Sequence, residues 1–453
     1  MDPEVPAKRT DATRIDTVFS EFGPRLLDSL PEIVERHFGQ GPFLIVSDER
    51  IRAAVGRRLD LFLERHPDSL LHILPAAPAP YASDALVAEI AAAIRSAGAT
   101  PIAVGAGTVN DVVKRAAFEA GRRYACVPTA PSVDGYTAYG AAITVGGFKT
   151  TLECPAPLCV VADEEIIAEA PYELIASGYG DLVAKLTGGA DWILADATGL
   201  EAVDRECWDM VQPSARAILG IPSKVRAREK PAIAALFKGL AMTGLAMQRY
   251  RDSRPASGAE HLLSHAWEMT HPAGGGQAAS HGYKVAIGTL VSAALFSSLF
   301  SEKGAAGQAL AERGFAPARR LLERRLEQAA SALEGHPALS KTERVLRQKT
   351  PGPELLGARA RLAGEKWEGL RAGILAQLPS FDLLKERLAA AGCPVEPADI
   401  GLSRSDCARA LTLASLIRPR YTVLDFASEL DVLEVGAEEA LSTRHFSSFA
   451  PER

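Results

Sequence analysis

The 453 residues are enough for about three domains, and two large domains are compatible with this length. Hydrophobic residues make up 47% and charged residues 23%, as in ordinary globular proteins with a sizeable core. The net charge of −6 argues against nucleic acid or an anionic membrane as the main partner.

The first segments along the chain are a polar tail and a helix. Residues 1–14 contain no apolar stretch of signal-peptide length, so we expect a disordered tail and no signal peptide. Residues 17–38 carry apolar side chains at helical spacing and predict one helix, which Pro24 or Pro31 can kink.

From residue 42 onward, apolar runs of strand length alternate with helical segments. This alternation is typical of a parallel sheet with helical crossovers. Gly146 and Gly147 lie between two short runs and predict a β-hairpin over 141–154. The runs that predict sheet strands are 43–47, 70–74, 101–105, 124–128 and 158–163, and two of the predicted helices are 83–98 and 111–120.

After residue 164 the strand pattern stops and almost every segment is helical. We therefore predict a Rossmann-like α/β domain at 15–164 and an all-helical domain at 165–453. Residues 305–375 are rich in Arg and Glu and are expected to form solvated amphipathic helices. The predicted helices are 181–197, 200–219, 231–252, 259–269, 282–302, 305–334, 340–348, 354–376, 381–390, 403–417 and 423–434.

Cysteine usage and hydropathy indicate the cell compartment. The six cysteines are scattered without a CxxC pair, which indicates reduced, buried residues of a cytoplasmic protein. The longest uncharged run, 285–301, contains Gly, Thr and several Ser and is short for a membrane span. We expect it to be a buried core helix, without membrane insertion.

The segment VGAGTVNDVVK (104–114) favours phosphate binding. Gly105 and Gly107 follow a predicted strand, and a helix is expected to begin near Asn110. The N–H groups and positive dipole end of a helix N-terminus suit a phosphate. The third glycine of GxGxxG is absent, and about half of such turns are only tight connections between elements.

The segment PTAPSVDGYTA (128–138) also follows a predicted strand, where ligands collect in open α/β sheets. Thr129 and Ser132 supply hydroxyl groups, and Asp134 supplies a carboxylate. A turn built from Pro, Gly and Asp explains the same residues without any ligand.

Histidines are concentrated in residues 258–288, which hold four of the nine in the chain. His261 and His265 are four residues apart and lie on one face of a predicted helix, and His281 follows a Gly-rich loop. Imidazole is both a common metal ligand and a proton carrier. For an isolated HxxxH pair, packing in the core is the commoner explanation.

A carboxylate upstream completes a candidate ligand set. Asp181 follows SGYG and is expected to start a helix, where a carboxylate also serves as a cap. Together with His261 and His281 it makes the open three-ligand pattern of catalytic zinc, which Ni²⁺ or Fe²⁺ also accepts. His271 is the alternative third ligand.

These segments, in this order, resemble the sn-glycerol-1-phosphate dehydrogenase family. It is part of a wider group of dehydroquinate-synthase-like and iron-containing alcohol dehydrogenase proteins. The resemblance covers about residues 40–300 and the segment LIRPRYTVLDFASEL (416–430). Its most specific pieces are PTAPSVDG, SGYGDLVAK and SRPASGAEHLLSH (253–265).

The resemblance implies a cofactor, NAD or NADP, and one divalent metal, with zinc favoured over nickel and iron. The expected metal ligands are Asp181, His261 and His281. Lys185 stands where related alcohol dehydrogenases often carry a further metal-binding His, which favours three ligands. The expected cofactor residues are Gly105, Gly107, Thr108, Val109, Asn110, Asp111, Thr129 and Ser132.

The resemblance also implies interconversion of dihydroxyacetone phosphate and sn-glycerol 1-phosphate by hydride transfer. The expected catalytic residues are His265, Asp134 and Asp181, and these three would also contact substrate. The candidate cations for the substrate phosphate are Lys149, Lys185 and Arg254. The only expected small-molecule partner besides the cofactor is this phosphorylated substrate, and we expect a homo-oligomer of two or more chains.

Three alternatives to this function stay open. One is another polyol or alcohol dehydrogenase, of the glycerol-dehydrogenase type. Another is a dehydroquinate-synthase-like lyase that uses NAD⁺ only transiently. The third is a cofactor-binding regulator without activity, which would have no need of an open metal site.

Overall fold

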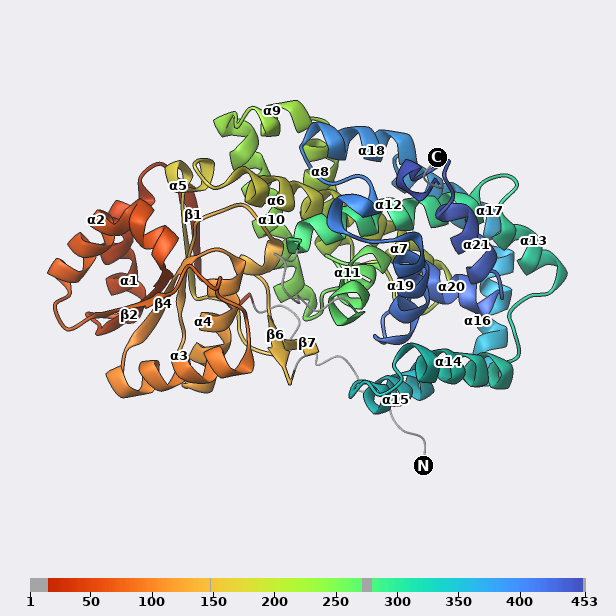
Figure 1. Ribbon diagram of the computed structural model, residues 1–453, viewed down its shortest axis with the longest axis horizontal. Helices are drawn as coiled ribbons and strands as arrows, with labels where there is room; N and C mark the ends of the chain where they lie inside the picture. The colour runs from red at the N-terminus through yellow and green to blue at the C-terminus, as the bar shows by residue number, and fades with distance from the viewer. Residues whose placement is uncertain (1–14, 147, 271–278, 451–453) are drawn as a thin grey trace. The chain divides into compact units, whose positions relative to one another are not determined.

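The computed structural model describes residues 15–146, 148–270 and 279–450, and for residues 148 and 149 only the backbone (Figure 1). The predicted disordered tail lies outside the described residues. The chain divides into two compact units: unit 1 comprises residues 1–171 and 237–255, and unit 2 comprises residues 172–236 and 256–453. Helix α10 (Lys230–Tyr250) is therefore shared, and its residues from Phe237 onward belong to unit 1.

Unit 1 is built on a six-stranded parallel sheet with the order β1-β8-β5-β4-β2-β3, which confirms the predicted α/β fold. After β3 the chain crosses back over β2 to β4, so the direction of strand order reverses beside β4. Ligand sites in open α/β sheets form at such reversals. The strands are β1 (Phe19–Gly23), β2 (Phe43–Asp48), β3 (Leu70–Leu74), β4 (Thr100–Gly105), β5 (Ala125–Pro128) and β8 (Cys159–Asp163).

Strand β1 corrects the prediction of one helix over 17–38. Phe19 to Gly23 pair in parallel with Cys159 to Asp163 of β8, and a helix, α1 (Leu30–Phe38), begins only later. The edge of β8 offers backbone partners that the local apolar spacing does not reveal. Pro31 lies in the first turn of α1, where its missing N–H costs nothing.

Alternate residues of the strands form one core of unit 1. Phe43 and Ile45, like Ile102 and Val104, point to the face that α1 and α2 cover. The antiparallel hairpin of β6 and β7 was also predicted. The remaining elements of unit 1 are α2 (Glu49–Arg65), α3 (Asp84–Ala97), α4 (Gly107–Glu119), α5 (Glu164–Ala168), β6 (Ala141–Val145) and β7 (Phe148–Leu152).

Unit 2 is helical throughout its described residues, as predicted. Three predicted helices are each divided in two, at Ala184, near Pro317 and at Lys366. The helices are α6 (Tyr172–Val183), α7 (Lys185–Ala197), α8 (Arg205–Leu219), α9 (Pro222–Arg226), α11 (Ala259–Thr270), α12 (His281–Phe300), α13 (Ala305–Glu312), α14 (Ala318–Ala332), α15 (Leu339–Lys349), α16 (Pro353–Glu365), α17 (Trp367–Gln377), α18 (Phe381–Ala390), α19 (Arg404–Leu416), α20 (Val423–Glu429) and α21 (Leu433–Ala440).

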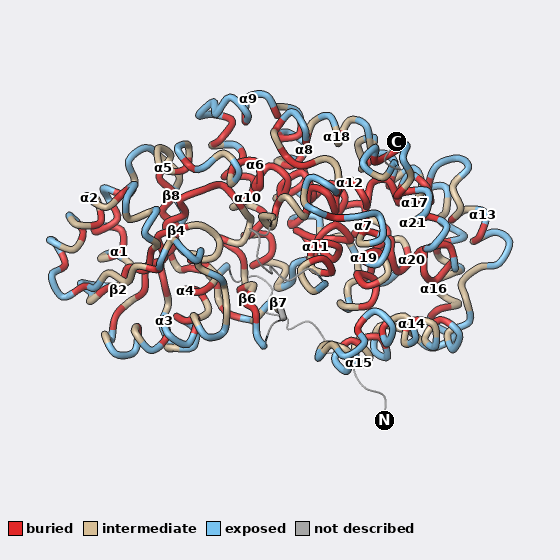
Figure 2. The backbone as a smooth tube through the Cα atoms, viewed as in Figure 1, coloured by how far each residue is buried: buried red, intermediate tan, exposed pale blue. Residues whose placement is uncertain are grey.

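Helix α12 is the central helix of unit 2. It is long and apolar enough to cross a membrane, but 83% of its most apolar 18-residue stretch is buried inside the protein. Figure 2 shows the burial along the chain. It packs against α6, α11, α18 and α21. As the sequence predicted, α12 is a core helix.

A buried ionic cluster joins the Arg-rich helices to α20. Asp425 lies 2.7 Å from Lys349 Nζ and 3.3 Å from Arg325 Nη2, and all three side chains are at most 4% exposed. Arg359 pairs in the same way with Glu429, which also accepts the Tyr421 hydroxyl proton at 2.6 Å. The sequence predicts solvated amphipathic helices over 305–375, but these three basic residues are buried.

Removing Asp425 should destabilise unit 2, because two buried cations would lose their partner. We expect Asp425→Ala to lower the free energy of unfolding by about 3–5 kcal/mol. The measurement is urea unfolding followed by circular dichroism. Glu323→Ala, which breaks the exposed pair with Arg319, is the control and should cost at most about 1 kcal/mol. Equal effects of the two substitutions would contradict the structural role of the cluster.

Candidate metal centre and cofactor turn

Three side chains from three helices of unit 2 converge. Asp181 of α6, His261 of α11 and His281, the first residue of α12, each offer a ligand atom, and these atoms lie within 4.8 Å of one another. Asp181 Oδ1 is 3.3 Å from His261 Nε2, and the two imidazole rings are 5.5 Å apart between centroids. The structure thus brings together the three ligands expected from sequence.

A backbone contact between α6 and α12 places Asp181 beside His281. A methyl group on Gly282 would lie 1.9 Å from the carbonyl oxygen of Ser177, and one on Gly180 would lie 2.7 Å from the carbonyl oxygen of Gly282. The Gly282 N–H also donates to Ser177 Oγ at 3.2 Å. Only glycine permits helices to approach this closely.

The expectation that Asp181 starts a helix is wrong. Asp181 lies in the last turn of α6, and SGYG is helical. Its second glycine, Gly180, provides close packing against α12 and does not form a turn. A third close contact lies beside His261, since a methyl group on Gly288 of α12 would lie 2.4 Å from the carbonyl oxygen of Glu260.

Charge at the cluster is strongly coupled. Lys185 Nζ donates to Asp181 Oδ1 at 2.8 Å, and both side chains are fully buried. Burial raises the pKa of Asp181, but the Lys185 charge and the His261 hydrogen bond outweigh it and leave the pKa well below the usual range. Burial and Lys185 lower the pKa of His261, yet hydrogen bonds to Asp181 and Glu260 raise it above the ordinary value.

These residues suit a divalent metal. One ionised carboxylate and two imidazoles are the donors of an open zinc site and are also accepted by nickel or iron. An ionised Asp181 at the centre of the cluster supplies the negative charge that such an ion requires. The alternative ligand His271 lies outside the described residues.

His265 lies one turn beyond His261 on α11, with its ring centroid 6.5 Å from that of His281. Its Nδ1 is 3.3 Å from Glu268 Oε2, and Glu268 Oε1 accepts a hydrogen bond from Lys284 Nζ at 2.6 Å. Sequence reasoning missed Glu268. The i, i+3 spacing to His265 was the available signal.

In unit 1, β4 ends at Gly105 and α4 begins at Gly107, three residues before the expected start near Asn110. A methyl group on Gly105 would lie 2.7 Å from Val109 Cβ, so this glycine permits the tight strand-to-helix turn. Ala106 precedes the helix and gives it no side-chain cap. The first N–H groups of α4 therefore suit an anion.

Asn110 and Asp111 organise the neighbouring loop. Asn110 donates to Gly135 O at 3.2 Å and accepts the Tyr124 hydroxyl proton at 3.0 Å, and Asp111 accepts from the Ala142 N–H at 3.3 Å. A buried lysine that the sequence reasoning missed, Lys114, has the same role. Its ammonium group donates to three carbonyl groups, those of Gly135 at 2.8 Å, Ala138 at 3.0 Å and Gly140 at 3.0 Å.

The segment after β5 lies next to this turn. The Thr129 N–H donates to Gly105 O at 3.2 Å, and Thr129 Oγ1 is buried without a hydrogen bond among the described residues. A buried hydroxyl group of this kind is suited to a ligand. Ser132 Oγ lies 2.9 Å from the Tyr136 hydroxyl, and Asp134 begins the short helix η2 (Asp134–Tyr136).

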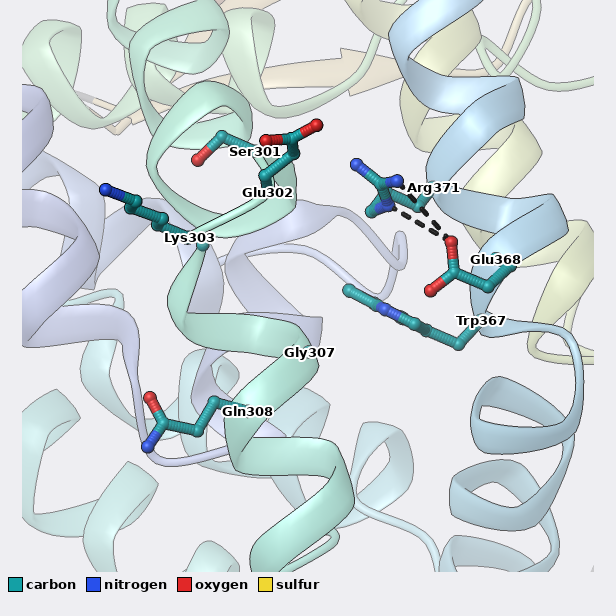
Figure 3. Close-up of a pocket in the computed structure, with 9 residues that line it drawn as sticks. Ser301, Glu302, Lys303, Gly307, Gln308, Trp367, Glu368 and Arg371 are labelled. Atoms are coloured by element: carbon teal, nitrogen blue, oxygen red, sulfur yellow. Dashed lines mark hydrogen bonds and ion pairs between the residues drawn. The ribbon is translucent and has the colours of Figure 1, made fainter.

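The remaining predicted residues are divided between the units. Asp134 and Arg254 belong to unit 1, and Lys185 belongs to unit 2 with the metal-ligand candidates. The Lys149 side chain lies outside the described residues. A separate cavity of about 320 Å³ in unit 2 contains none of the predicted site residues and is lined by Ser301–Gly304, Gly307, Gln308, Trp367, Glu368 and Arg371 (Figure 3).

Comparison with known proteins decides the family. The family profile "Iron-containing alcohol dehydrogenase" matches residues 21–171. The glycerol-1-phosphate dehydrogenase (NAD(P)+) of Sulfurisphaera tokodaii is 32% identical over 272 residues, which span 60% of this chain and 75% of that protein. The chain belongs to the glycerol-1-phosphate dehydrogenase family, as the sequence motifs predicted.

Other members of this glycerol-1-phosphate dehydrogenase family match over shorter regions. The relative from Halalkalibacterium halodurans is 36% identical over 195 residues, which are 43% of this chain and 49% of the relative. The relative from Geobacillus thermodenitrificans is 34% identical, with 54% of this chain and 62% of the relative aligned. The chain thus spans about half to three-fifths of the length of these two relatives.

Solved structures of the same fold extend beyond this family. Sulfoacetaldehyde reductase from Bifidobacterium kashiwanohense, solved with NAD⁺, has a TM-score of 0.60 and 13% identity, and the match covers 95% of this chain and 98% of that chain. Glycerol dehydrogenase from Schizosaccharomyces pombe has a TM-score of 0.59 and 13% identity, with 97% and 95% covered. At this identity the likeness shows the fold alone.

Substitution of Gly282 should disturb the cluster without removing a ligand. We expect Gly282→Ala to push α12 away from α6 and to weaken zinc binding at least about tenfold, because His281 moves away from Asp181. Isothermal titration of metal-stripped protein measures this. Gly369→Ala on α17, where no atom lies within 4 Å of the added methyl group, is the matched control and should bind like the wild type. Unchanged affinity in Gly282→Ala would contradict the importance of this contact.

Metal binding should depend on pH through His261. The imidazole must lose its Nε2 proton before a metal binds, and its pKa in the metal-free protein lies above the ordinary value near 6.5. Apparent zinc affinity should therefore fall with decreasing pH, and the fall should begin above pH 6.5. Competition titrations between pH 5.5 and 8.5 measure this. An affinity that does not change over that pH range would contradict the prediction.

Proposed function

We propose that the chain catalyses the NAD(P)-dependent interconversion of dihydroxyacetone phosphate and sn-glycerol 1-phosphate. The observation that carries the proposal is the convergence of Asp181, His261 and His281 within 4.8 Å, in a chain of this family. A regulator without activity would have no use for three converging metal-ligand side chains, two of which, Asp181 and His261, are buried. The relatives named above carry this activity in their names.

In this proposal Asp181, His261 and His281 bind one divalent ion, with zinc favoured and nickel or iron as alternatives. Such an ion, when bound, supplies Lewis-acid stabilisation of the negative charge that develops on the substrate oxygen. Lys185 stabilises the ionised form of Asp181 through its 2.8 Å hydrogen bond. Asp181 is therefore already ionised before the ion arrives.

The cofactor, NAD or NADP, would bind at the β4–α4 turn of unit 1. The N–H groups of Gly107, Thr108 and Val109 begin a helix without a side-chain cap and can donate to the pyrophosphate. Gly105 permits the turn, and Thr129 offers a buried hydroxyl group. Asn110 and Asp111 contribute mainly by shaping the loop that carries Ser132 and Asp134.

His265 is the proposed proton carrier. A bound reduced nicotinamide would supply the hydride for C2 of the ketone, and the ketone oxygen would then require one proton. The His265 side chain is 21% exposed, which permits proton exchange with solvent, and its ring lies beside His281. Glu268 accepts from Nδ1 and orients Nε2 for this transfer. Asp134 is proposed to contact substrate.

The substrate phosphate requires cations. Lys185, Arg254 and Lys149 remain the candidates, and Lys185 belongs to the same unit as the metal ligands. We further propose a cytoplasmic homo-oligomer of two or more chains. The six cysteines are all free and buried, which supports a reducing compartment.

A substrate comparison tests the proposed function. With either cofactor, we expect kcat/KM for dihydroxyacetone phosphate to exceed that for dihydroxyacetone at least about 100-fold, because charge-assisted bonds to phosphate contribute about 1.5–3 kcal/mol each. The measurement is oxidation of NADH or NADPH followed at 340 nm by steady-state kinetics. Equal values would favour a glycerol-dehydrogenase-like enzyme. Turnover of a sugar phosphate without net nucleotide redox change would favour a lyase.

A further inference from the structure

Glu260 is a buried carboxylate that is not among the residues predicted for the site. Its side chain is completely buried, although it is adjacent in sequence to the metal-ligand candidate His261. Oε1 accepts a hydrogen bond from the Gly258 N–H at 2.6 Å, and Oε2 accepts the Thr187 hydroxyl proton at 3.1 Å. Burial of an ionised carboxylate is costly unless several donors compensate it, so its position is specific.

The same carboxylate contacts the imidazole of His261. Glu260 Oε1 lies 2.9 Å from Nδ1 of that ring, whereas Nε2 faces Asp181 at 3.3 Å. The two ring nitrogens therefore have different partners. When Nδ1 donates its proton to a carboxylate, the lone pair is on Nε2, which is the nitrogen within the ligand cluster.

Glu260 lies in the first turn of α11, and segments distant in sequence bind the start of this helix. Asp191 of α7 accepts from the Ala259 N–H at 2.7 Å and from the Val423 N–H at 2.6 Å, so one carboxylate binds the first residues of α11 and α20. Arg420 donates to the carbonyl oxygen of Ser257 at 2.8 Å. The segment 416–430, whose role the sequence motifs left open, thus contributes to the placement of α11.

We propose that Glu260 is a positioning residue for the metal centre: it holds His261 in the Nδ1–H tautomer and orients Nε2 toward the ion. The inference rests on the metal site of the proposed function. Because Glu260 contacts the opposite edge of the ring from Asp181, it acts through His261 and is not a ligand. Outer carboxylates of this kind raise metal affinity in other metalloproteins.

The test compares Glu260→Ala and Glu260→Gln with the wild type, using the full chain stripped of metal. Co²⁺ is titrated without substrate or cofactor, and both affinity and the visible spectrum of bound Co²⁺ are recorded. We expect Glu260→Ala to weaken binding about 10–100-fold and to change the spectrum. The amide oxygen of Glu260→Gln can still accept from Nδ1, so this variant should lose less affinity and keep the wild-type spectrum.

Glu429→Gln is the matched control. Glu429 is similarly buried and hydrogen-bonded, but to Tyr421 and Arg359. It should bind Co²⁺ like the wild type, and circular dichroism confirms that each variant is folded. If Glu260→Ala is unfolded, Glu260→Gln is compared with Glu429→Gln. The proposal is contradicted if the two variants differ from the wild type to the same extent in Co²⁺ affinity or in the Co²⁺ spectrum.

The outcomes separate this inference from the proposed function. Wild-type affinity and spectrum in Glu260→Ala would overturn the inference alone. A wild-type chain that binds Co²⁺ but does not reduce dihydroxyacetone phosphate would contradict the proposed activity and leave the role of Glu260 standing. A wild-type chain that binds no metal would contradict both.

Discussion

The backbone contact between α6 and α12 is the constraint on which the candidate metal centre depends. Gly180 and Gly282 let the two helices approach so closely that any larger residue would overlap a carbonyl group. Asp181 follows Gly180, and His281 precedes Gly282. The close packing of the two helices therefore also places the two candidate ligands beside each other. A similar contact at Gly288 places α11, and with it His261, against the same central helix. The candidate ligands therefore lie on packed helices and not on loops.

Buried charge forms the second layer of this organisation in unit 2. Asp191, Glu260 and Asp425 are all buried, and each accepts hydrogen bonds at or near the first residue of a helix. Taking such a group out of water is favourable only when several donors compensate it, so these carboxylates specify which helix starts lie together. The C-terminal segment is connected in this way to the helix that carries His261.

In unit 1, some polar groups near the β4–α4 turn bond to other parts of the protein, and others keep the capacity to bond to a ligand. Lys114 donates hydrogen bonds to three carbonyl groups of the loop, and the Asn110 side chain donates a fourth hydrogen bond to the same loop. Their polarity is used within the protein. The uncapped N-terminus of α4 and the buried hydroxyl of Thr129 are the groups with hydrogen-bonding capacity at the edge of the sheet. The sequence motifs assign Asn110 and Thr129 alike to the cofactor and do not single out Lys114.

Local periodicity was enough to predict β3 and α18 with their observed bounds and the parallel sheet followed by helices, and residue chemistry supplied the three ligand candidates. These features depend on alternation, helical spacing and residue chemistry over short stretches. Strand β1, the position of Asp181 within a helix and the contact of Glu260 with His261 were not predictable in this way. Each depends on a partner distant in sequence: the edge of β8 for β1, the surface of α12 for the glycines of α6, and Thr187 for the carboxylate of Glu260. Short-range patterns carry no information on such partners, because the free energy that selects them comes from packing and desolvation in the folded chain.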